Sequence, residues 1–248
     1  MQIEGCTCIV TGGASGLGRG TVAELLARGA NVAIFARRQP PPEKIEPGAM
    51  FVLADITDDD AVARGVQRVV DTYGALHACV NVAAIAGGQR MVDETGLFPL
   101  DVFRNFININ LTGTFIVLRR AIEQMLKNPS DGPDGERGVI VNTSSIGAQD
   151  ASSNAAYSAS KGGVESMALT LARNLGPHGI RINTIAPGLM QTEMLGDMTP
   201  EWNEQLLRKT VFPNRLGLPA EFGQLACHII ENRFMNATVI RLDAGTRA

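Results

Sequence analysis

Long apolar runs, clustered charge and metal-ligand spacing are all missing from this chain of 248 residues. No apolar stretch approaches the ~20 residues that a membrane-spanning helix needs, so the sequence predicts no membrane partner. The formal net charge is only −3 and the charges are scattered, which predicts no binding to nucleic acid. The first strand is expected almost at the start of the chain, which leaves no room for a signal peptide and makes the cytoplasm the expected location.

Cysteine is also scarce, with four in the chain. Cys6 and Cys8 flank one apolar run, Cys79 lies in another, and Cys227 falls in a late helical pattern. None has the spacing of metal ligands, so the sequence predicts no metal site, and we interpret all four as core thiols.

Hydrophobic residues make up 45% of the chain, enough for a sizeable core. The length suits one large α/β domain or two small ones, and we interpret residues 1–248 as a single domain because no linker or repeat is evident. Short runs rich in Val, Ile and Ala alternate with longer segments of helical periodicity, which predicts βαβ units. The expected fold is a doubly wound parallel seven-stranded sheet with helices on both faces, the Rossmann fold.

The same pattern predicts where the elements lie. Strands are expected near residues 7–12, 31–36, 50–54, 76–81, 138–143, 181–186 and 237–242. Helices are expected near residues 17–28, 59–73, 101–127, 156–175 and 219–231. The crossover at 37–48 contains three consecutive prolines, so its helix is expected to be shortened or lost.

Tyr157 and Lys161 form the first candidate site. They are four residues apart, so on a helix they share one face and are separated by a rise of about 6 Å. A nearby cation favours a phenolate, and Lys161 is therefore expected to lower the pKa of Tyr157 towards that of a general acid/base. The spacing alone is common in helices that have no catalytic role.

Ser144 lies thirteen residues before Tyr157 and follows the apolar run Val139–Val141. It is expected at the carboxyl end of a strand, where open α/β sheets bind ligands. The adjacent Ser145 is expected to point away from the site if the strand persists, because side chains alternate along a strand.

Three glycines, Gly12, Gly16 and Gly18, follow the first expected strand and open a helix. They would let the backbone turn sharply and approach a pyrophosphate, whose charge a helix N-terminus favours. The pattern predicts dinucleotide binding, although in isolation it also fits an ordinary glycine-rich turn. Its position between a strand and a helix favours the dinucleotide.

Taken together, these pieces resemble the short-chain dehydrogenase/reductase superfamily over the whole chain. The family's motifs occur in its order: Thr11-Gly12-x-x-x-Gly16-x-Gly18, Asp55, Asn81, Asn110, Ser144, Tyr157-x-x-x-Lys161 and Pro187-Gly188. Within the superfamily, the segments 137–144, 155–163, 185–189 and 239–243 are most similar to type-II 3-hydroxyacyl-CoA dehydrogenases.

The resemblance implies a hydride transfer between a nicotinamide cofactor and a secondary alcohol or ketone. Tyr157 would exchange a proton with the substrate oxygen while Ser144 holds that oxygen. Lys161 would stabilise the phenolate and grip the nicotinamide ribose. Asn110 would hold a water that completes a proton relay; the alternative is a structural amide.

The resemblance also implies a set of cofactor-binding residues: Gly12, Ser15, Gly16, Leu17, Gly18, Ala36, Arg37, Arg38, Asp55, Ile56, Asn81, Val82, Ala83, Tyr157, Lys161, Pro187, Gly188, Met190 and Thr192. Asp55 matches the residue that contacts the adenine, although an aspartate there could equally cap the next helix. Thr192 is the expected partner of the carboxamide. Ala84 departs from the pattern, because the family has glycine at its position.

The end of the second strand predicts which nicotinamide is bound. Ala36 stands where NAD-preferring members have an acidic residue that would bind the ribose 2′-hydroxyl. Arg37 and Arg38 follow it and offer planar donors suited to a phosphate. The sequence predicts NADP, with NAD as the alternative, in which the two arginines are merely solvated.

Substrate and assembly are implied only by the resemblance. It suggests a 3-hydroxyacyl-CoA/3-oxoacyl-CoA pair, a substrate lid at about 189–215, and a homotetramer formed through the helices near 101–127 and 156–175. Lid residues that offer apolar surface are Met190, Met194, Leu195, Met198 and Trp202, although such a stripe could also be a packed helix. Gln149, Asp150 and Ala151 are expected to face the pocket.

Two other functions stay open at this point. One is a 3-oxoacyl carrier-protein reductase, which would be favoured by a basic patch for an acidic carrier, but Arg119, Arg120 and Lys127 are too dispersed to form one. The other is a non-catalytic cofactor-binding scaffold, which would not need the complete set of catalytic side chains.

Overall fold

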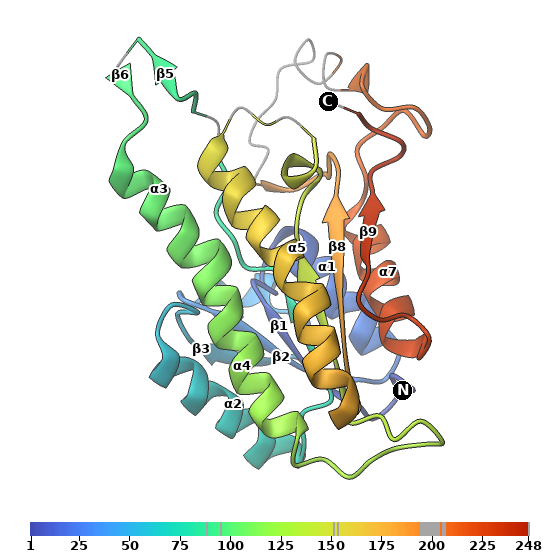
Figure 1. Cartoon of the computed structure of the whole chain (residues 1–248). Coiled ribbons are helices and arrows are strands. Elements are labelled where there is room, and N and C mark those ends of the chain that lie inside the picture. Colours follow the sequence, from blue (N-terminus) through green and yellow to red (C-terminus); the bar gives the residue numbers. More distant parts are fainter. Residues whose placement is uncertain are drawn as a thin grey trace.

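A seven-stranded sheet forms the centre of the molecule (Figure 1). The computed structural model describes residues 1–87, 89–94, 96–150, 152, 154–193, 204 and 207–247. The strands of the sheet are β1 (Thr7–Thr11), β2 (Asn31–Ala36), β3 (Met50–Leu53), β4 (Ala78–Asn81), β7 (Gly138–Thr143), β8 (Ile180–Pro187) and β9 (Val239–Leu242). They lie in the order β3-β2-β1-β4-β7-β8-β9, and every neighbouring pair is parallel. The predicted Rossmann fold is confirmed.

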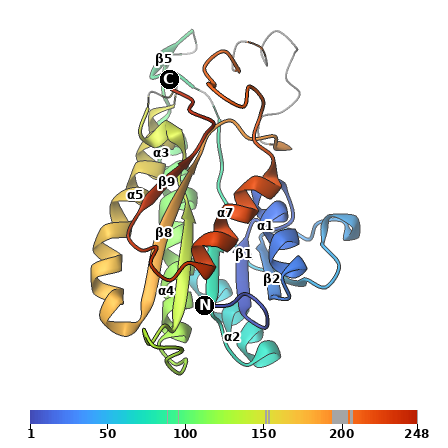
Figure 2. The ribbon, with the colours of Figure 1, turned by 90° about the vertical axis from the view of Figure 1, so that its right-hand side faces the viewer.

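Helices cover both faces of this sheet (Figures 1 and 2). They are α1 (Gly16–Ala27), α2 (Asp59–Tyr73), α3 (Leu100–Phe106), α4 (Thr114–Met125), α5 (Ala155–Leu175) and α7 (Pro219–Glu231). One buried cluster joins the sheet to α1 and α7, and a second joins it to α2, α4 and α5. Ile9 and Val10 of β1 belong to different clusters because successive side chains of a strand point to opposite faces. Burial on both faces explains why the inner strands β1, β2, β4 and β7 contain near-continuous apolar runs.

The chain order reverses between β1 and β4 in the middle of the sheet. From β1 the chain proceeds outward to β2 and β3, then returns to β4 on the other side of β1. Connections that leave β1 and β4 therefore diverge, and ligands of open α/β sheets bind at such a switch point. The polar loop 128–137 lies at the opposite ends of the strands, where β7 begins, and residues 129–134 are exposed (Figure 1).

Three features differ from the predicted elements. The helix expected near 101–127 is interrupted by a π-helical segment, Ile107–Gly113, between α3 and α4. A hairpin of β5 (Val92–Asp93) and β6 (Gly96–Leu97) was not predicted; it projects from the body near the carboxyl edge (Figure 1). The proline-rich crossover holds only a 3₁₀ turn at Pro42–Lys44, which confirms the expected loss of a helix there.

All four cysteines are free and buried, as the sequence predicts. Burial raises the pKa of the Cys79 thiol to about 12, so it stays protonated at neutral pH. None of the helices in the described part of the chain is long and apolar enough to cross a bilayer.

Candidate active site

Tyr157 and Lys161 lie in the first two turns of α5. Asn154 caps this helix, since its side-chain oxygen accepts a hydrogen bond of 3.0 Å from the Tyr157 amide. The Lys161 ammonium is buried and donates a hydrogen bond of 2.8 Å to the Thr143 carbonyl at the end of β7. Burial lowers the pKa of Lys161 to about 8, because the charged form is poorly solvated there.

The phenol of Tyr157 is half-buried. Its ring meets that of Phe106 from α3 edge to face, with 6.3 Å between the centroids. Burial raises the pKa of Tyr157, and a side-chain hydrogen bond with Ser145 opposes that rise. The prediction that Lys161 lowers the pKa of Tyr157 is wrong for this structure. The phenol is desolvated, and the Lys161 ammonium donates its hydrogen bond to Thr143 instead.

The two serines after β7 face opposite sides, and the prediction assigned them the wrong way round. Ser144 is buried, and its Oγ donates to Glu165 Oε1 at 2.7 Å, with the Lys161 carbonyl 3.2 Å away. Ser145, which was expected to point away, is the serine that interacts with the Tyr157 phenol. The backbone at Ser145 is extended, so side chains continue to alternate between the two faces beyond the end of β7. Ser144 therefore lies on the same face as Ile140, which packs in the buried cluster with α5.

Ser145 also begins the turn that follows the strand. Its Oγ accepts a hydrogen bond of 3.1 Å from the Gly147 amide and caps the 3₁₀ turn Ile146–Ala148. Ser158 of α5 donates to the Gly147 carbonyl at 2.6 Å, which ties this turn to the helix that bears Tyr157. The only sequence signal for Ser145 was its adjacency to Ser144, and alternation alone could not say which serine faced the phenol.

Asn110 lies in the π-helical segment and is fully buried. Its amide oxygen accepts from the Ile85 amide at 2.8 Å, while its Nδ2 lies 2.9 Å from the Ile85 carbonyl and 3.1 Å from Ser160 Oγ. The side chain therefore links the loop after β4 to α5, one residue before Lys161. π-Bulges inside helices are frequent at functional sites.

The glycine turn joins β1 to α1. Gly12 has φ +68°, and its amide donates to the Phe35 carbonyl at 2.8 Å. A Cβ on Gly18 would lie 2.3 Å from the Gly12 carbonyl oxygen, so the helix approaches the turn at a distance that only glycine allows. Ser15 occupies the N-cap position of α1 without a side-chain cap hydrogen bond, and Leu17 lies in the first turn. These features fit a pyrophosphate site, since the first amides of α1 point outward.

Several other predicted residues lie at the carboxyl ends of the strands. Thr11 Oγ1 at the end of β1 accepts from the amides of Val82 and Ala83 at 3.0 and 3.1 Å. Asn81 at the end of β4 donates to Asn142 of β7 at 2.9 Å. These contacts hold three neighbouring strand ends together along the predicted cofactor crevice.

The expected adenosine side of the crevice follows β2 and β3. Ala36 ends β2, and Arg37 and Arg38 after it are exposed. Asp55 accepts hydrogen bonds from the Thr57 amide at 2.9 Å and the Thr57 hydroxyl at 2.7 Å, and these bonds, with the charge of Arg37, lower its pKa. Ile56 is buried, and Gly113 of the π-helical segment leaves it room.

The connection after β8 lies beside the glycine turn. Pro187 ends β8, the Gly188 amide donates to the Leu242 carbonyl, and Met190 is buried against Gly217. Thr192 is so close to Gly16 that a Cβ there would meet its methyl group at 3.2 Å. Of the predicted lid, Met194, Leu195, Met198 and Trp202 lie outside the described residues, as does Ala151 of the expected pocket.

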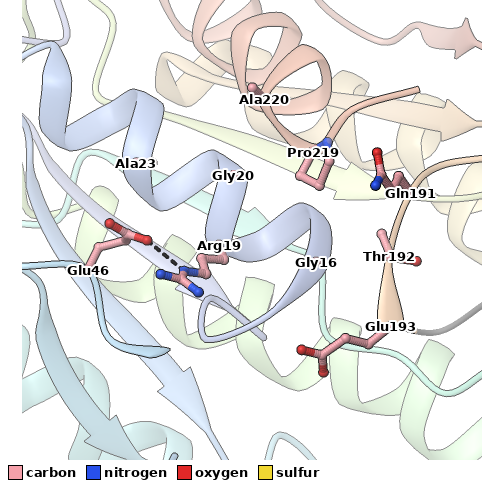
Figure 3. A pocket seen from close by; sticks show the side chains of 10 residues that line it. All are labelled: Gly16, Arg19, Gly20, Ala23, Glu46, Gln191, Thr192, Glu193, Pro219 and Ala220. Carbon is pink, nitrogen blue, oxygen red and sulfur yellow. Dashed lines mark hydrogen bonds and ion pairs between the residues drawn. The ribbon is translucent and has the colours of Figure 1, made fainter. Parts of the chain in front are cut away.

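A cavity of about 490 Å³ opens beside Gly16 and Thr192 (Figure 3). It lies between α1, the start of α7 and the Arg19–Glu46 ion pair of 2.6 Å. Tyr157 and Lys161 do not line it. The cavity therefore borders the glycine turn and is separate from these two side chains.

Residues 7–203 match the family model of the short chain dehydrogenases. The chain belongs to this family. 3-Hydroxyacyl-CoA dehydrogenase type-2 of Bos taurus is 38% identical to this dehydrogenase over 253 residues, which cover 99% of this chain and 97% of the relative. The solved structure of 3-hydroxyacyl-CoA dehydrogenase type-2 from Mycobacterium avium has a TM-score of 0.92 and 33% identity, covering 100% of this chain and 98% of that one.

A carrier-protein enzyme is also among the relatives of this dehydrogenase. The 3-oxoacyl-[acyl-carrier-protein] reductase of Thermotoga maritima is 30% identical over 262 residues, with 99% of each chain covered. Family membership and the named dehydrogenases make this protein an NAD(P)-dependent oxidoreductase that acts on a small molecule with a nicotinamide cofactor.

Proposed function

We propose that this short-chain dehydrogenase interconverts a secondary alcohol and its ketone, with NADP(H) as cofactor and a 3-hydroxyacyl-CoA/3-oxoacyl-CoA pair as substrate. The observation that supports the reaction is the contact between the Tyr157 phenol and the Ser145 hydroxyl at the carboxyl edge of the sheet, with Lys161 one turn further along α5. A phenol and a second hydroxyl together can hold and protonate one substrate oxygen.

Each side chain has one task in this reaction. Tyr157 donates a proton to the carbonyl oxygen in reduction, or accepts the alcohol proton in oxidation. Ser145 takes the place first expected for Ser144 and holds that oxygen by a hydrogen bond. Lys161 offers an ammonium to the nicotinamide ribose, and Asn110 positions the β4 loop against α5 through Ile85 and Ser160. The bound nicotinamide supplies or accepts the hydride.

The crevice along the strand ends would hold the cofactor. The turn Gly12–Gly18 would bind the pyrophosphate of the cofactor, and Asp55 and Ile56 would lie at its adenine end. The segment Asn81–Ala83 would lie along the middle of the cofactor, and the segment Pro187–Thr192 would bind its carboxamide. The residues that support NADP are Arg37 and Arg38, which are exposed and follow a strand end that lacks an acidic residue. Guanidinium groups bind phosphate through paired hydrogen bonds.

The cofactor proposal is tested by comparing kcat/KM for NADPH and NADH. We expect a preference for NADPH that is lost in Arg37→Ala/Arg38→Ala, while kcat/KM for NADH changes little. The matched control is Arg64→Ala on α2, which removes a positive charge at a different site. A preference of the unchanged enzyme for NADH would refute the assignment.

The substrate is best tested with a panel of 3-oxoacyl-CoA thioesters, 3-oxoacyl carrier-protein thioesters, simple ketones and secondary alcohols, each with both cofactors. The relatives' names support the CoA thioester, and we expect it to give the highest kcat/KM. A higher value for the carrier-protein thioester would instead support the reductase that the Thermotoga relative exemplifies.

Tyr157→Phe should abolish turnover while the cofactor still binds; retained turnover would refute the role of the phenol.

We also propose that four copies assemble through the helical segments near 101–127 and 156–175, which comprise α3, α4 and α5, and that residues 189–215 cover the substrate. Apolar side chains on α3, α4 and α5 support the assembly: Phe103, Phe115 and Leu169 are 36%, 42% and 52% exposed in the single chain. Large exposed apolar side chains on neighbouring helices are typical of protein interfaces.

A further inference from the structure

Glu165 lies on α5 one turn beyond Lys161, next to the turn 144–150 that contains Ser145. Its Oε1 accepts a hydrogen bond of 2.7 Å from Ser144 Oγ and another of 3.0 Å from Gln149 Nε2. These two donors lie at the beginning and near the end of the turn 144–150. One carboxylate oxygen thus ties both ends of the turn to the helix that bears Tyr157.

A second charged group holds the same turn from the other side. Arg241 of β9 donates to Gln149 Oε1 at 3.1 Å and to the two carboxylate oxygens of Asp150 at 3.1 and 2.8 Å. Arg241 is itself fixed by Asp243, at 2.7 Å. Hydrogen bonds between ionised groups are about twice as strong as neutral ones, so this arrangement gives the turn a defined place between α5 and β9.

We propose that Glu165 is a positioning residue, which acts through Ser144 and Gln149 to hold the turn 144–150 so that the Ser145 hydroxyl faces the Tyr157 phenol. This inference rests on the proposed function and deepens it. Ser145 is covalently next to Ser144, so a shift of the Ser144 backbone, which its hydrogen bond to Glu165 restrains, also moves Ser145. Ser144 is only 2% exposed, and without Glu165 its hydroxyl keeps the Lys161 carbonyl alone, at 3.2 Å.

Kinetics of two substitutions test the role. In Glu165→Ala the turn loses its two hydrogen bonds to the carboxylate of α5 but keeps those from Arg241, and kcat should fall roughly 10- to 100-fold, the size expected for an ångström-scale misplacement of a reacting group. The KM for the cofactor should stay within about twofold, because the glycine turn is untouched. Glu165→Gln keeps an acceptor oxygen at the same place and should recover most of the wild-type kcat.

Glu123 supplies a matched control. It lies on α4 and pairs with Arg120 at 3.0 Å on an exposed surface. Glu123→Ala and Glu123→Gln remove a helical carboxylate without touching the turn, and both should leave kcat unchanged. A wild-type kcat in Glu165→Ala, or an equal loss in Glu165→Gln, would refute positioning by an acceptor oxygen.

A titration of Tyr157 tests the same inference without turnover. The chain has two tyrosines, so Tyr73→Phe leaves Tyr157 as the only one whose phenolate absorbs in the near ultraviolet. The groups that act on Tyr157 in the described structure are the Ser145 hydroxyl from the turn and the uncharged Phe106 ring from α3. Lys161, the titratable neighbour on its own helix, points to Thr143.

The direction of the shift separates two explanations. If Glu165 positions Ser145, Glu165→Ala weakens the contact that stabilises the phenolate and raises the pKa of Tyr157, while Glu165→Gln leaves it near the wild-type value. If Glu165 acts only through its charge, both substitutions remove a nearby anion and lower that pKa, and the inference is wrong. This titration stands even if no substrate of the panel is turned over, so failure of the proposed reaction and failure of the positioning role remain distinguishable.

Discussion

At the scale of single residues, adjacent serines have different tasks because β7 alternates its side chains to two environments. Ser144 belongs to the buried side beneath α5 and bonds to Glu165, whereas Ser145 reaches the phenol of Tyr157. The chemistry of the two side chains is identical. Only their position relative to the first turn of α5 distinguishes the hydroxyl that we propose holds the substrate from the one that bonds to Glu165.

Replacing Ser145 by alanine should therefore lower kcat by roughly 100-fold, the usual effect of removing one donor from the oxygen-binding site of a transition state. Cofactor affinity, measured by nucleotide fluorescence, should change little because Ser145 lies away from the glycine turn. Ser145→Thr keeps a hydroxyl and serves as the control, with a smaller loss. If Ser145→Ala were as active as the wild type, the assignment of the substrate-holding hydroxyl to Ser145 would be wrong.

The buried Lys161 makes stability depend on pH. Its native pKa of about 8 lies below the ordinary value of 10.5, so between these values the unfolded chain binds more protons than the native one. The contribution of Lys161 to the free energy of unfolding therefore rises with pH across this window. Relative to Lys161→Met, which does not titrate, the wild type should gain on the order of 2 kcal/mol between about pH 7 and pH 10. Urea unfolding of both proteins at each pH measures this; a constant difference would contradict a lowered pKa.

At the scale of elements, we expect the close approach of α1 to the end of β1 to determine whether the glycine turn can accept a cofactor. Gly18→Ala places a Cβ against the Gly12 carbonyl, and a backbone atom cannot rotate away. We expect a loss of about 1–3 kcal/mol in the free energy of unfolding and a higher dissociation constant for the nucleotide.

Gly162 provides the control for that substitution. It lies within α5, and a Cβ there would meet nothing within 4 Å. Gly162→Ala should be neutral or stabilising by up to ~1 kcal/mol, since alanine favours helix interiors. If Gly18→Ala behaved like Gly162→Ala in thermal unfolding and nucleotide binding, the close packing of α1 on the turn would not limit the site.

The sequence predicted the seven strands and the main helices because the inner strands are buried on both faces and most strands contain a short apolar run. It could not predict the hairpin β5–β6, whose strands are two residues long and exposed. The π-helical segment was missed for another reason: one wider turn at Ile107–Gly113 changes the hydrogen bonds but leaves a pattern that still reads as one helix.

The candidate site was predictable as a set of residue types, and less so as a geometry. The spacing of Tyr157 and Lys161 predicts that they share a helix face, but the direction of their pKa shifts depends on burial and, for Tyr157, on the hydrogen bond with Ser145, which are tertiary properties. Glu165 carries no motif of its own. Its hydrogen bonds to Ser144 and Gln149 exist only because α5 packs across the end of β7.

At the scale of the whole molecule, the exposed apolar side chains of α4 and α5 predict the oligomeric state. Phe115→Glu/Leu169→Glu should convert the proposed tetramer to smaller species, because two buried carboxylates without partners are costly at an interface. Light scattering after size exclusion measures the mass. Leu53→Glu, at an exposed site on β3, is the control that should leave it unchanged. A monomeric wild type would contradict the proposed assembly.

In this parallel sheet the proposed site lies at the carboxyl ends of the strands, and the loops at their amino ends are therefore suitable for engineering. The exposed loop 129–134 precedes β7, whereas Ser145 and the other groups proposed to act on the substrate lie beyond the other end of that strand. A peptide tag or fluorescent reporter inserted between Pro133 and Asp134 should therefore follow the enzyme through purification or in a cell while its catalytic rate stays that of the untagged protein.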